Sequence, residues 1–111
     1  MFYNNAGYQN ISPDQLIKKL SSREDVFLLD VRTPAEHAAQ AIDGSYLIPL
    51  QALTERLREL PKDREIIVYC RTGNRSAYVS SYLSRLGYNV KNLEGGIVLW
   101  NMAGNRSLAH A

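Results

Sequence analysis

The chain has 111 residues, enough for one hydrophobic core but not for two, so we expect a single domain spanning 1–111. With 45% hydrophobic and 22% charged residues and no low-complexity run, the composition excludes a disordered chain. The net charge of +2 is too small, and the basic residues are too scattered, to indicate a nucleic-acid or membrane partner. Residues 1–10 lack a signal-peptide pattern and no apolar run reaches membrane-spanning length, so we expect a cytoplasmic protein.

Three segments predict the elements in the first half of the chain. Ser12-Pro13-Asp14-Gln15 combines a capping hydroxyl, a proline at the first helical position and a capping glutamine, so a helix is expected to begin there. Val26–Val31 is an almost continuous apolar run of strand length, which is typical of a strand buried on both faces. Thr33-Pro34-Ala35-Glu36 repeats the capping pattern and predicts a short helix through about Ala39.

The second half of the chain also alternates strands and helices. The expected elements are, in order, a strand at Tyr46–Ile48 that ends before Pro49, an amphipathic helix at Gln51–Leu60, a buried strand at Ile66–Tyr69, a helix at Ser76–Leu86 closed by Gly87, a strand at Asn89–Leu93 and a helix at Gly96–Met102. Apolar strands that alternate with helices indicate an α/β fold whose parallel sheet is covered on both faces. Ligands of such sheets bind beyond the carboxyl ends of the strands.

The only cysteine in the sequence, Cys70, directly follows the predicted strand Ile66–Tyr69. A single thiol excludes an intramolecular disulfide and a multi-thiolate metal site, so Cys70 is either an unreactive side chain packed in the core or a reactive thiol. The residues after it are Arg71, Thr72, Gly73, Asn74, Arg75 and Ser76. Such a polar run does not belong to an apolar core, whereas the N–H groups of a loop that opens a helix can bind an anion. We therefore predict that Cys70 is a reactive thiolate.

The loop must supply enough energy to ionise this thiol. Lowering a thiol pKa from about 8.5 by about two units raises the thiolate fraction at pH 7 from roughly 3% to roughly three quarters, and needs about 2.7 kcal/mol. A helix dipole contributes about 0.3–1 kcal/mol, rising to about 2 kcal/mol in favourable geometry. Direct hydrogen bonds and Arg71 or Arg75 must supply the remainder, and the spacing does not say which arginine faces the sulfur and which faces a substrate.

The chain resembles the rhodanese-like domains. The segments that carry the resemblance are Asp30-Val31-Arg32 with Glu36, Ile42 to Pro49, the loop Cys70 to Arg75, and Leu93-Glu94-Gly95-Gly96 followed by Trp100, which is expected to pack in the core. The likeness covers a core at about 11–102 and implies a central, mostly parallel five-stranded sheet with helices on both faces, a catalytic Cys70, and no cofactor or metal. One departure is Gln40-Ala41-Ile42, where the family usually has Gly-His-Ile, with Ser45 replacing the alanine after Gly44. Family details of the packing near that turn and of partner preference are therefore not carried over to this chain.

The resemblance implies sulfur transfer through a persulfide on Cys70. A lone nucleophile without a resolving thiol suits double displacement: Cys70 takes the outer sulfur of a small anionic donor such as thiosulfate and passes it to cyanide, a small thiol or a protein thiol. Arg71 and Arg75 are expected to hold the oxyanion of the donor. Further hydrogen bonds are expected from Thr72, Gly73, Asn74 and Ser76.

Two alternatives remain open at this point. A cysteine-loop phosphatase or arsenate reductase also binds a tetrahedral oxyanion on a thiolate, but such enzymes resemble a wider loop whose arginine would fall at the position of Ser76. The other alternative is a non-catalytic binding or regulatory module of the rhodanese-like kind, for which Cys70→Ser would leave the cellular function intact.

Other charged residues receive more modest predictions. Arg32 and Glu36 are four positions apart and are expected either as a surface ion pair or as a brace for the site. Asp30 lies near the carboxyl end of a strand, where it would orient loop groups or bind neighbouring backbone. His37 and His110 are expected to be exposed, without a partner at metal-ligand spacing.

Overall fold

The computed structural model describes residues 7–109, with side chains as far as Gly104. Its strands are β1 (Gln9–Ile11), β2 (Val26–Asp30), β3 (Tyr46–Leu47), β4 (Glu65–Tyr69) and β5 (Val90–Leu93). They form one five-stranded sheet in the order β1-β5-β4-β2-β3, and all four neighbouring pairs are parallel. The predicted α/β fold with a five-stranded sheet is confirmed, and the sheet is parallel throughout.

The helices are α1 (Pro13–Ser21), α2 (Pro34–Ala39), α3 (Asn74–Arg85) and α4 (Gly96–Ala109). Both predicted capping boxes form: the side chain of Ser12 accepts from the N–H of Gln15, and that of Thr33 accepts from the N–H of Glu36. Pro follows each cap at the first helical position, where its missing N–H costs no hydrogen bond. Local signals therefore fix where both helices begin.

The edge strand β1 was not predicted from the sequence. Its residues, Gln9, Asn10 and Ile11, show neither an apolar run nor a clear alternation, and two of them are exposed. The strand exists because its backbone pairs with Lys91–Leu93 of β5. Long-range pairing of this kind leaves no local sequence signal.

The predicted amphipathic helix at Gln51–Leu60 is wrong. This segment instead forms two short 3₁₀ helices, η2 (Leu50–Ala52) and η3 (Thr54–Glu59), with a non-helical break at Arg56. Hydrogen bonds there span three residues, as from the N–H of Leu53 to the carbonyl of Leu50 at 3.3 Å. Leu50 and Leu53 are three residues apart, as are Leu57 and Leu60, and this spacing suits the tighter 3₁₀ turn, in which residues i and i+3 lie on one line. The apolar face was predicted correctly, but the hydrogen-bond pattern was not.

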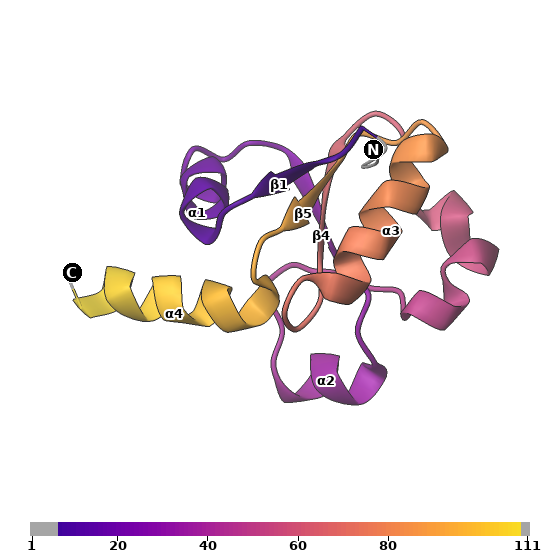
Figure 1. Ribbon diagram of the computed structural model, residues 1–111. Coiled ribbons are helices and arrows are strands. Elements are labelled where there is room, and N and C mark those ends of the chain that lie inside the picture. The colour runs from indigo at the N-terminus through magenta and orange to yellow at the C-terminus, as the bar shows by residue number, and fades with distance from the viewer. Residues whose placement is uncertain (1–6, 110–111) are drawn as a thin grey trace.

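Helices cover both faces of the sheet (Figure 1). On one face, α3 and the 3₁₀ segments pack over the strands around Val68, Val79 and Leu83. On the other face, α1 and α4 pack around Leu16, Ile67 and Ile97, and Trp100 joins this cluster, so its predicted core position is confirmed. Among residues 7–109, no helix combines the length and apolar character that crossing a membrane requires.

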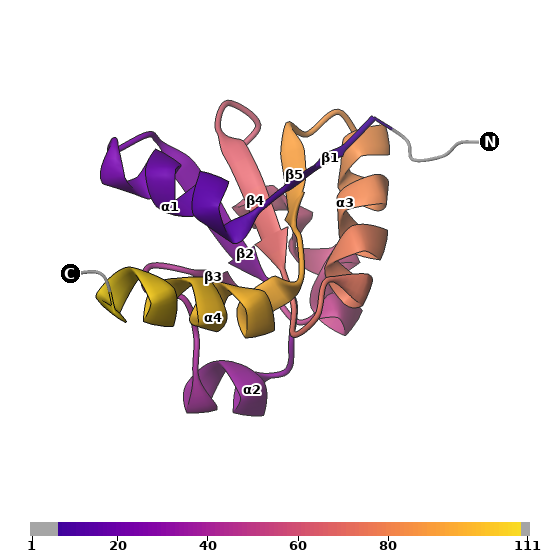
Figure 2. The same cartoon turned by 60° about the vertical axis from the view of Figure 1, so that its left-hand side comes forward.

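The carboxyl ends of β2 and β4 lie side by side. Asp30 pairs in register with Tyr69, so the residues that follow these strands emerge next to each other. From this edge α2 projects below the sheet, while α4 runs across it (Figure 2). The fold thus brings α2, the loop after β4 and the start of α4 to one edge of the sheet.

Candidate active site

Cys70 is the first residue after β4, and its side chain is buried, with 1% exposure. Its Sγ accepts hydrogen bonds from the backbone N–H of Gly73 at 3.1 Å, from the N–H of Ser76 at 3.4 Å and from the hydroxyl of Ser76 at 3.4 Å. Gly73 has φ +105°, a conformation that favours glycine and turns the chain from the loop into α3. The loop therefore closes around the sulfur with donors directed at it.

Burial opposes ionisation of the Cys70 thiol, yet its pKa lies below the ordinary value because hydrogen bonds outweigh the burial. The hydroxyl of Ser76 contributes most to this lowering, followed by the backbone N–H groups of Ser76, Gly73 and Thr72. Such donors stabilise the charged form more than the neutral one. The prediction of a thiolate-stabilising loop agrees with this geometry.

The start of α4 holds the other side of the loop. The N–H of Ile97 donates to the carbonyl of Cys70 at 2.9 Å, and the N–H of Val98 donates to the carbonyl of Arg71 at 3.1 Å. A Cβ on Gly96 would lie 2.4 Å from the Arg71 oxygen and 2.5 Å from the Cys70 oxygen, so only glycine fits there. These bonds take up the first two carbonyls of the loop. The sequence analysis did not predict this role of Gly96, because the contact joins segments distant in the chain.

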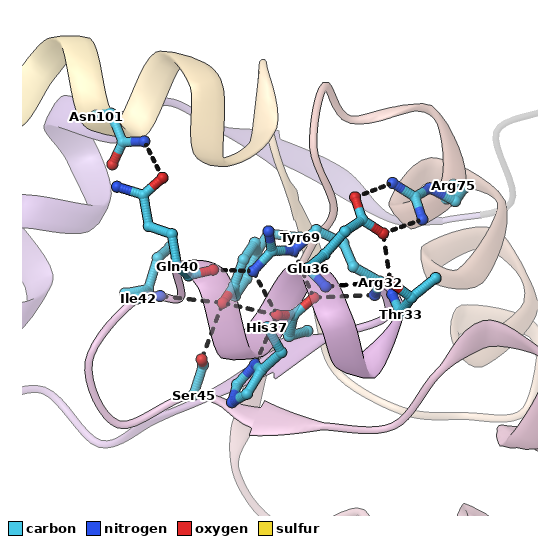
Figure 3. A network of polar contacts seen from close by, with 11 residues as sticks. Arg32, Thr33, Glu36, His37, Gln40, Ile42, Ser45, Tyr69, Arg75 and Asn101 are labelled. Atoms are coloured by element: carbon cyan, nitrogen blue, oxygen red, sulfur yellow. Dashed lines mark hydrogen bonds and ion pairs between the residues drawn. The ribbon is translucent and has the colours of Figure 1, made fainter.

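The two arginines of the loop have different surroundings. Arg75 donates to both carboxylate oxygens of Glu36, from Nη1 at 2.9 Å and from Nη2 at 3.0 Å (Figure 3). The Arg75 guanidinium, helped by the helix cap at Thr33, lowers the pKa of Glu36 to about 2. Arg71 is exposed, and its side chain makes no hydrogen bond or ion pair with the residues that the structure describes. The structure thus separates two arginines that their spacing left equivalent.

Arg32 does not pair with Glu36, so the predicted Arg32–Glu36 surface pair is wrong. Arg32 is 4% exposed and donates to buried Asp30 from Nε at 3.0 Å and from Nη2 at 2.8 Å. Its Nη2 also donates to the carbonyl of Gln40 at 2.6 Å. The side chain of Arg32 turns back to its own strand because a buried carboxylate attracts it more strongly than an exposed one. Glu36 is left to pair with Arg75, and the pair braces α2 against the loop.

Asp30 is buried and contacts Arg32, His37 and Tyr69 at the centre of a polar cluster. These three partners are labelled in Figure 3. Burial raises its pKa, but hydrogen bonds from Arg32 and His37 outweigh that effect and leave the pKa below the ordinary value. The hydroxyl of Tyr69 donates to Asp30 Oδ2 at 3.1 Å. Because Tyr69 immediately precedes Cys70, Asp30 anchors the residue from which the loop departs, rather than the loop groups themselves.

His37 is half-buried, so its predicted exposure is wrong. Its Nδ1 lies 2.8 Å from Asp30 Oδ2, a contact that a helix start directly after β2 makes possible. His110 lies outside the described residues. Within residues 7–109, no three His, Cys, Asp or Glu side chains gather closely enough to hold a metal ion.

The turn after α2 holds residues that depart from the family pattern, and two of them, Gln40 and Ser45, contact this cluster. The hydroxyls of Ser45 and Tyr69 are hydrogen-bonded at 2.9 Å, and the N–H of Ile42 donates to the same tyrosine oxygen at 3.1 Å. The side chain of Gln40 accepts from Asn101 of α4 at 3.0 Å. Gln40 and Ser45 therefore link α2 to the sheet and to α4.

Of the remaining loop residues, Thr72 and Asn74 are exposed and Ser76 is buried. Thr72 contributes its backbone N–H to the sulfur, while the side chains of Thr72 and Asn74 face solvent at the start of α3. Ser76 is fully buried and directs its hydroxyl at Sγ. Both the N–H and the hydroxyl of Ser76 therefore contact the cysteine sulfur.

Comparison with known proteins agrees with this architecture. Residues 12–103 match the model of the rhodanese-like domain, and the chain belongs to that family. It is 43% identical over 91 residues to a protein of Allochromatium vinosum named sulfurtransferase, with 81% of this chain and 85% of the relative covered. A crystal structure of a rhodanese-related protein from Thermoplasma volcanium superposes with a TM-score of 0.81 at 36% identity, covering 87% of this chain and 94% of that one.

A larger relative contains a similar domain. The chain is 40% identical over 93 residues to the probable adenylyltransferase/sulfurtransferase MoeZ of Mycobacterium tuberculosis. The match covers 81% of this chain but only 24% of the mycobacterial protein. The likeness therefore concerns one part of that relative.

Proposed function

We propose that this chain is a single-domain sulfurtransferase whose Cys70 carries the transferred sulfur as a persulfide. The observation that carries the proposal is the set of donors on Sγ, from Gly73 at 3.1 Å and from Ser76 at 3.4 Å. They stabilise a thiolate before reaction and a persulfide anion after it, because both place negative charge in the same loop. Membership of the rhodanese-like family and the name of the Allochromatium relative support the same reaction class.

The first half-reaction loads the cysteine. The Cys70 thiolate attacks the outer sulfur of a donor such as thiosulfate, a sulfur–sulfur bond forms to Sγ, and the donor's own sulfur–sulfur bond breaks to release sulfite. The negative charge of the thiolate passes to the new outer sulfur, and the leaving group keeps the bonding electron pair. No general base is needed, since the loop already favours the ionised thiol.

The second half-reaction delivers the sulfur to an acceptor. The outer sulfur extends about 2 Å beyond Sγ, the length of a sulfur–sulfur bond. This extension matters because Cys70 itself is buried, so the acceptor attacks the outer atom and not Sγ. Cyanide or a thiol, small or protein-borne, would complete the cycle and regenerate the thiolate.

The phosphatase alternative fits the loop less well. In a loop one residue wider, an arginine at position 76 would bind the phosphoryl oxygens. Here that position is Ser76, which is buried with its hydroxyl on Sγ, and the arginine one residue earlier is bound to Glu36. Neither residue offers a free guanidinium to a phosphate dianion.

Mass spectrometry tests the proposal directly. After incubation with thiosulfate and removal of the excess, the wild-type chain should gain one sulfur atom, and cyanide should remove it as thiocyanate. Cys70→Ser should gain none, because it lacks the nucleophile. Equal labelling of both proteins, or hydrolysis of an aryl phosphate without any sulfur gain, would exclude the persulfide mechanism. If the wild type forms the persulfide but Cys70→Ser supports normal cellular function, the non-catalytic role is favoured.

A further inference from the structure

The loop has two arginines, Arg71 and Arg75. Of these two, Arg71 has no hydrogen-bond or ion-pair partner among the residues that the structure describes. Both terminal nitrogens of Arg75 donate to the Glu36 carboxylate (Figure 3). Glu36 is itself fixed, since its Oε1 also accepts from the backbone N–H of Thr33 at the start of α2. Arg75 is therefore held from a second element and is not free to swing toward a bound anion.

The Glu36–Arg75 pair faces solvent at the loop. The side chain of Arg75 is 37% exposed and that of Glu36 is 28% exposed, so an approaching donor meets the carboxylate as well as the guanidinium. Arg75 also lies within electrostatic range of the sulfur: its pKa is raised chiefly by Glu36, with smaller contributions from Cys70 and Asp30. With Cys70 ionised, the two arginines are balanced by two negative groups, Glu36 and the thiolate.

We propose that Glu36 is a specificity-determining residue, which withholds Arg75 from the donor and biases the loop toward sulfur donors of low negative charge. Arg71 is then the arginine that contacts the donor. A loop with two free arginines would suit a dianion, whereas this one is neutral when ready to react. Repulsion between Glu36 and a donor grows in proportion to the donor's charge. The inference rests on the proposed persulfide function and specifies its substrate class: monoanionic or uncharged sulfane-sulfur donors, ahead of dianionic thiosulfate.

Thiosulfate and methanethiosulfonate form a suitable pair of probes. In both, the Cys70 thiolate attacks a terminal sulfur and the sulfur–sulfur bond breaks. Thiosulfate, a dianion, releases sulfite dianion; methanethiosulfonate, a monoanion, releases methanesulfinate. Each reaction leaves one persulfide anion on the enzyme, so atoms and charge balance. The probes differ mainly in charge and in one methyl group at the sulfonyl sulfur.

The test compares kcat/KM for the two donors in wild type and in Glu36→Gln. Gln keeps the capping role at the helix start and can still accept one hydrogen bond from Arg75, but it removes the charge. We expect Glu36→Gln to raise kcat/KM roughly fivefold for thiosulfate and roughly twofold for methanethiosulfonate, because the repulsion removed scales with donor charge. Glu36→Ala removes the same charge, so it should shift the donor preference in the same direction even if the fold is less stable.

Glu59→Gln is the matched control. Glu59 accepts hydrogen bonds from Nε and Nη2 of Arg56, both at 2.8 Å, and its pKa is likewise lowered to about 2. Glu59 lies in η3, however, where it also accepts from the hydroxyl of Tyr46 on the edge strand. It should leave the donor preference unchanged. Equal changes for both donors, no change, or a fall in the thiosulfate value with Glu36→Gln would overturn the proposal. A wild type that gains sulfur from neither donor would instead contradict the proposed function itself.

Discussion

Two regions at the same edge of the sheet hold negative charge by different means. Around Cys70, backbone N–H groups and one hydroxyl surround the sulfur at 3.1–3.4 Å, and no cationic side chain that the structure describes is hydrogen-bonded to it. Around Asp30, on the opposite face of the sheet, a buried guanidinium from Arg32 approaches to 2.8 Å and His37 Nδ1 lies equally close. Their residues are neighbours, since Tyr69 of the Asp30 cluster directly precedes Cys70.

The difference fits the reactive role proposed for Cys70 and the structural role of Asp30. A carboxylate bound to a guanidinium through both oxygens is neutralised and fixed in place. Peptide dipoles stabilise charge without neutralising it. The Asp30 cluster therefore positions the strand end, while the loop keeps its anion available. Three changes test this division, from the largest expected effect to the smallest.

Replacing Arg32 with Met should have the largest effect on stability. The change leaves Asp30, which is 0% exposed, without its main counter-charge. We expect a loss of about 3 kcal/mol in the free energy of unfolding, measured in urea at neutral pH. The double variant Asp30→Leu with Arg32→Met should lose less, because it removes the buried charge as well. A double variant less stable than Arg32→Met alone would contradict the view that Asp30 is neutralised by pairing.

Gly96→Ala should displace the loop and slow persulfide formation, with a smaller loss of stability than Arg32→Met. Its Cβ would meet the carbonyls of Cys70 and Arg71 at 2.5 and 2.4 Å, so the loop must shift away from α4. A displacement of about 1 Å at a reacting group can cost about 10²-fold in rate, and we expect a fall of that order in persulfide formation. Gly44→Ala is the control, since Gly44 has a similar left-handed φ of +80° but open space around its Cβ position. Equal losses from both variants would assign the effect to backbone strain.

Ser76→Ala should cause the smallest change, confined to the pKa of Cys70. Loss of the hydroxyl at 3.4 Å removes the largest stabilising hydrogen bond on the thiolate, so the pKa should rise by about one unit or less. The measurement is the pH dependence of Cys70 alkylation by iodoacetamide. Ser80→Ala, one turn further along α3, is the control, because the buried Ser80 hydroxyl has no hydrogen-bond partner among the described residues. If the pKa of Cys70 stays constant in Ser76→Ala, the backbone N–H groups alone stabilise the thiolate.

The same lowered pKa makes stability depend on pH. The folded-state pKa of Cys70 lies below that of an ordinary thiol, so the thiolate contribution to stability is fully present above the unfolded-state pKa and is lost as pH falls through the folded-state pKa. Relative to Cys70→Ala, the wild type should therefore gain stability as pH rises between these two values. In Ser76→Ala the pH range between the two pKa values should narrow. Thermal unfolding at several pH values measures this change.

Much of the fold was predictable because its signals are local. Ser12 and Thr33 cap helices through neighbours three residues away, and the apolar runs before Asp30 and Cys70 have strand length. The strand β1 and the 3₁₀ segment around Arg56 were not predictable, because pairing with β5 and packing at the sheet edge decide them. Propensity gives way to such tertiary contacts.

The sequence by itself determined that Cys70 ends a buried strand and that a polar, glycine-containing loop of fixed length follows it. These features depend on residue type and order, which set backbone freedom and the supply of N–H donors. Only the tertiary structure decided the partners of the charged groups. Arg32 turned to Asp30 and Arg75 to Glu36, because burial and the meeting of β2, α2 and the loop at one edge select among pairs that the spacing left equal. That choice left Arg71 as the loop's free cation within the described part of the chain.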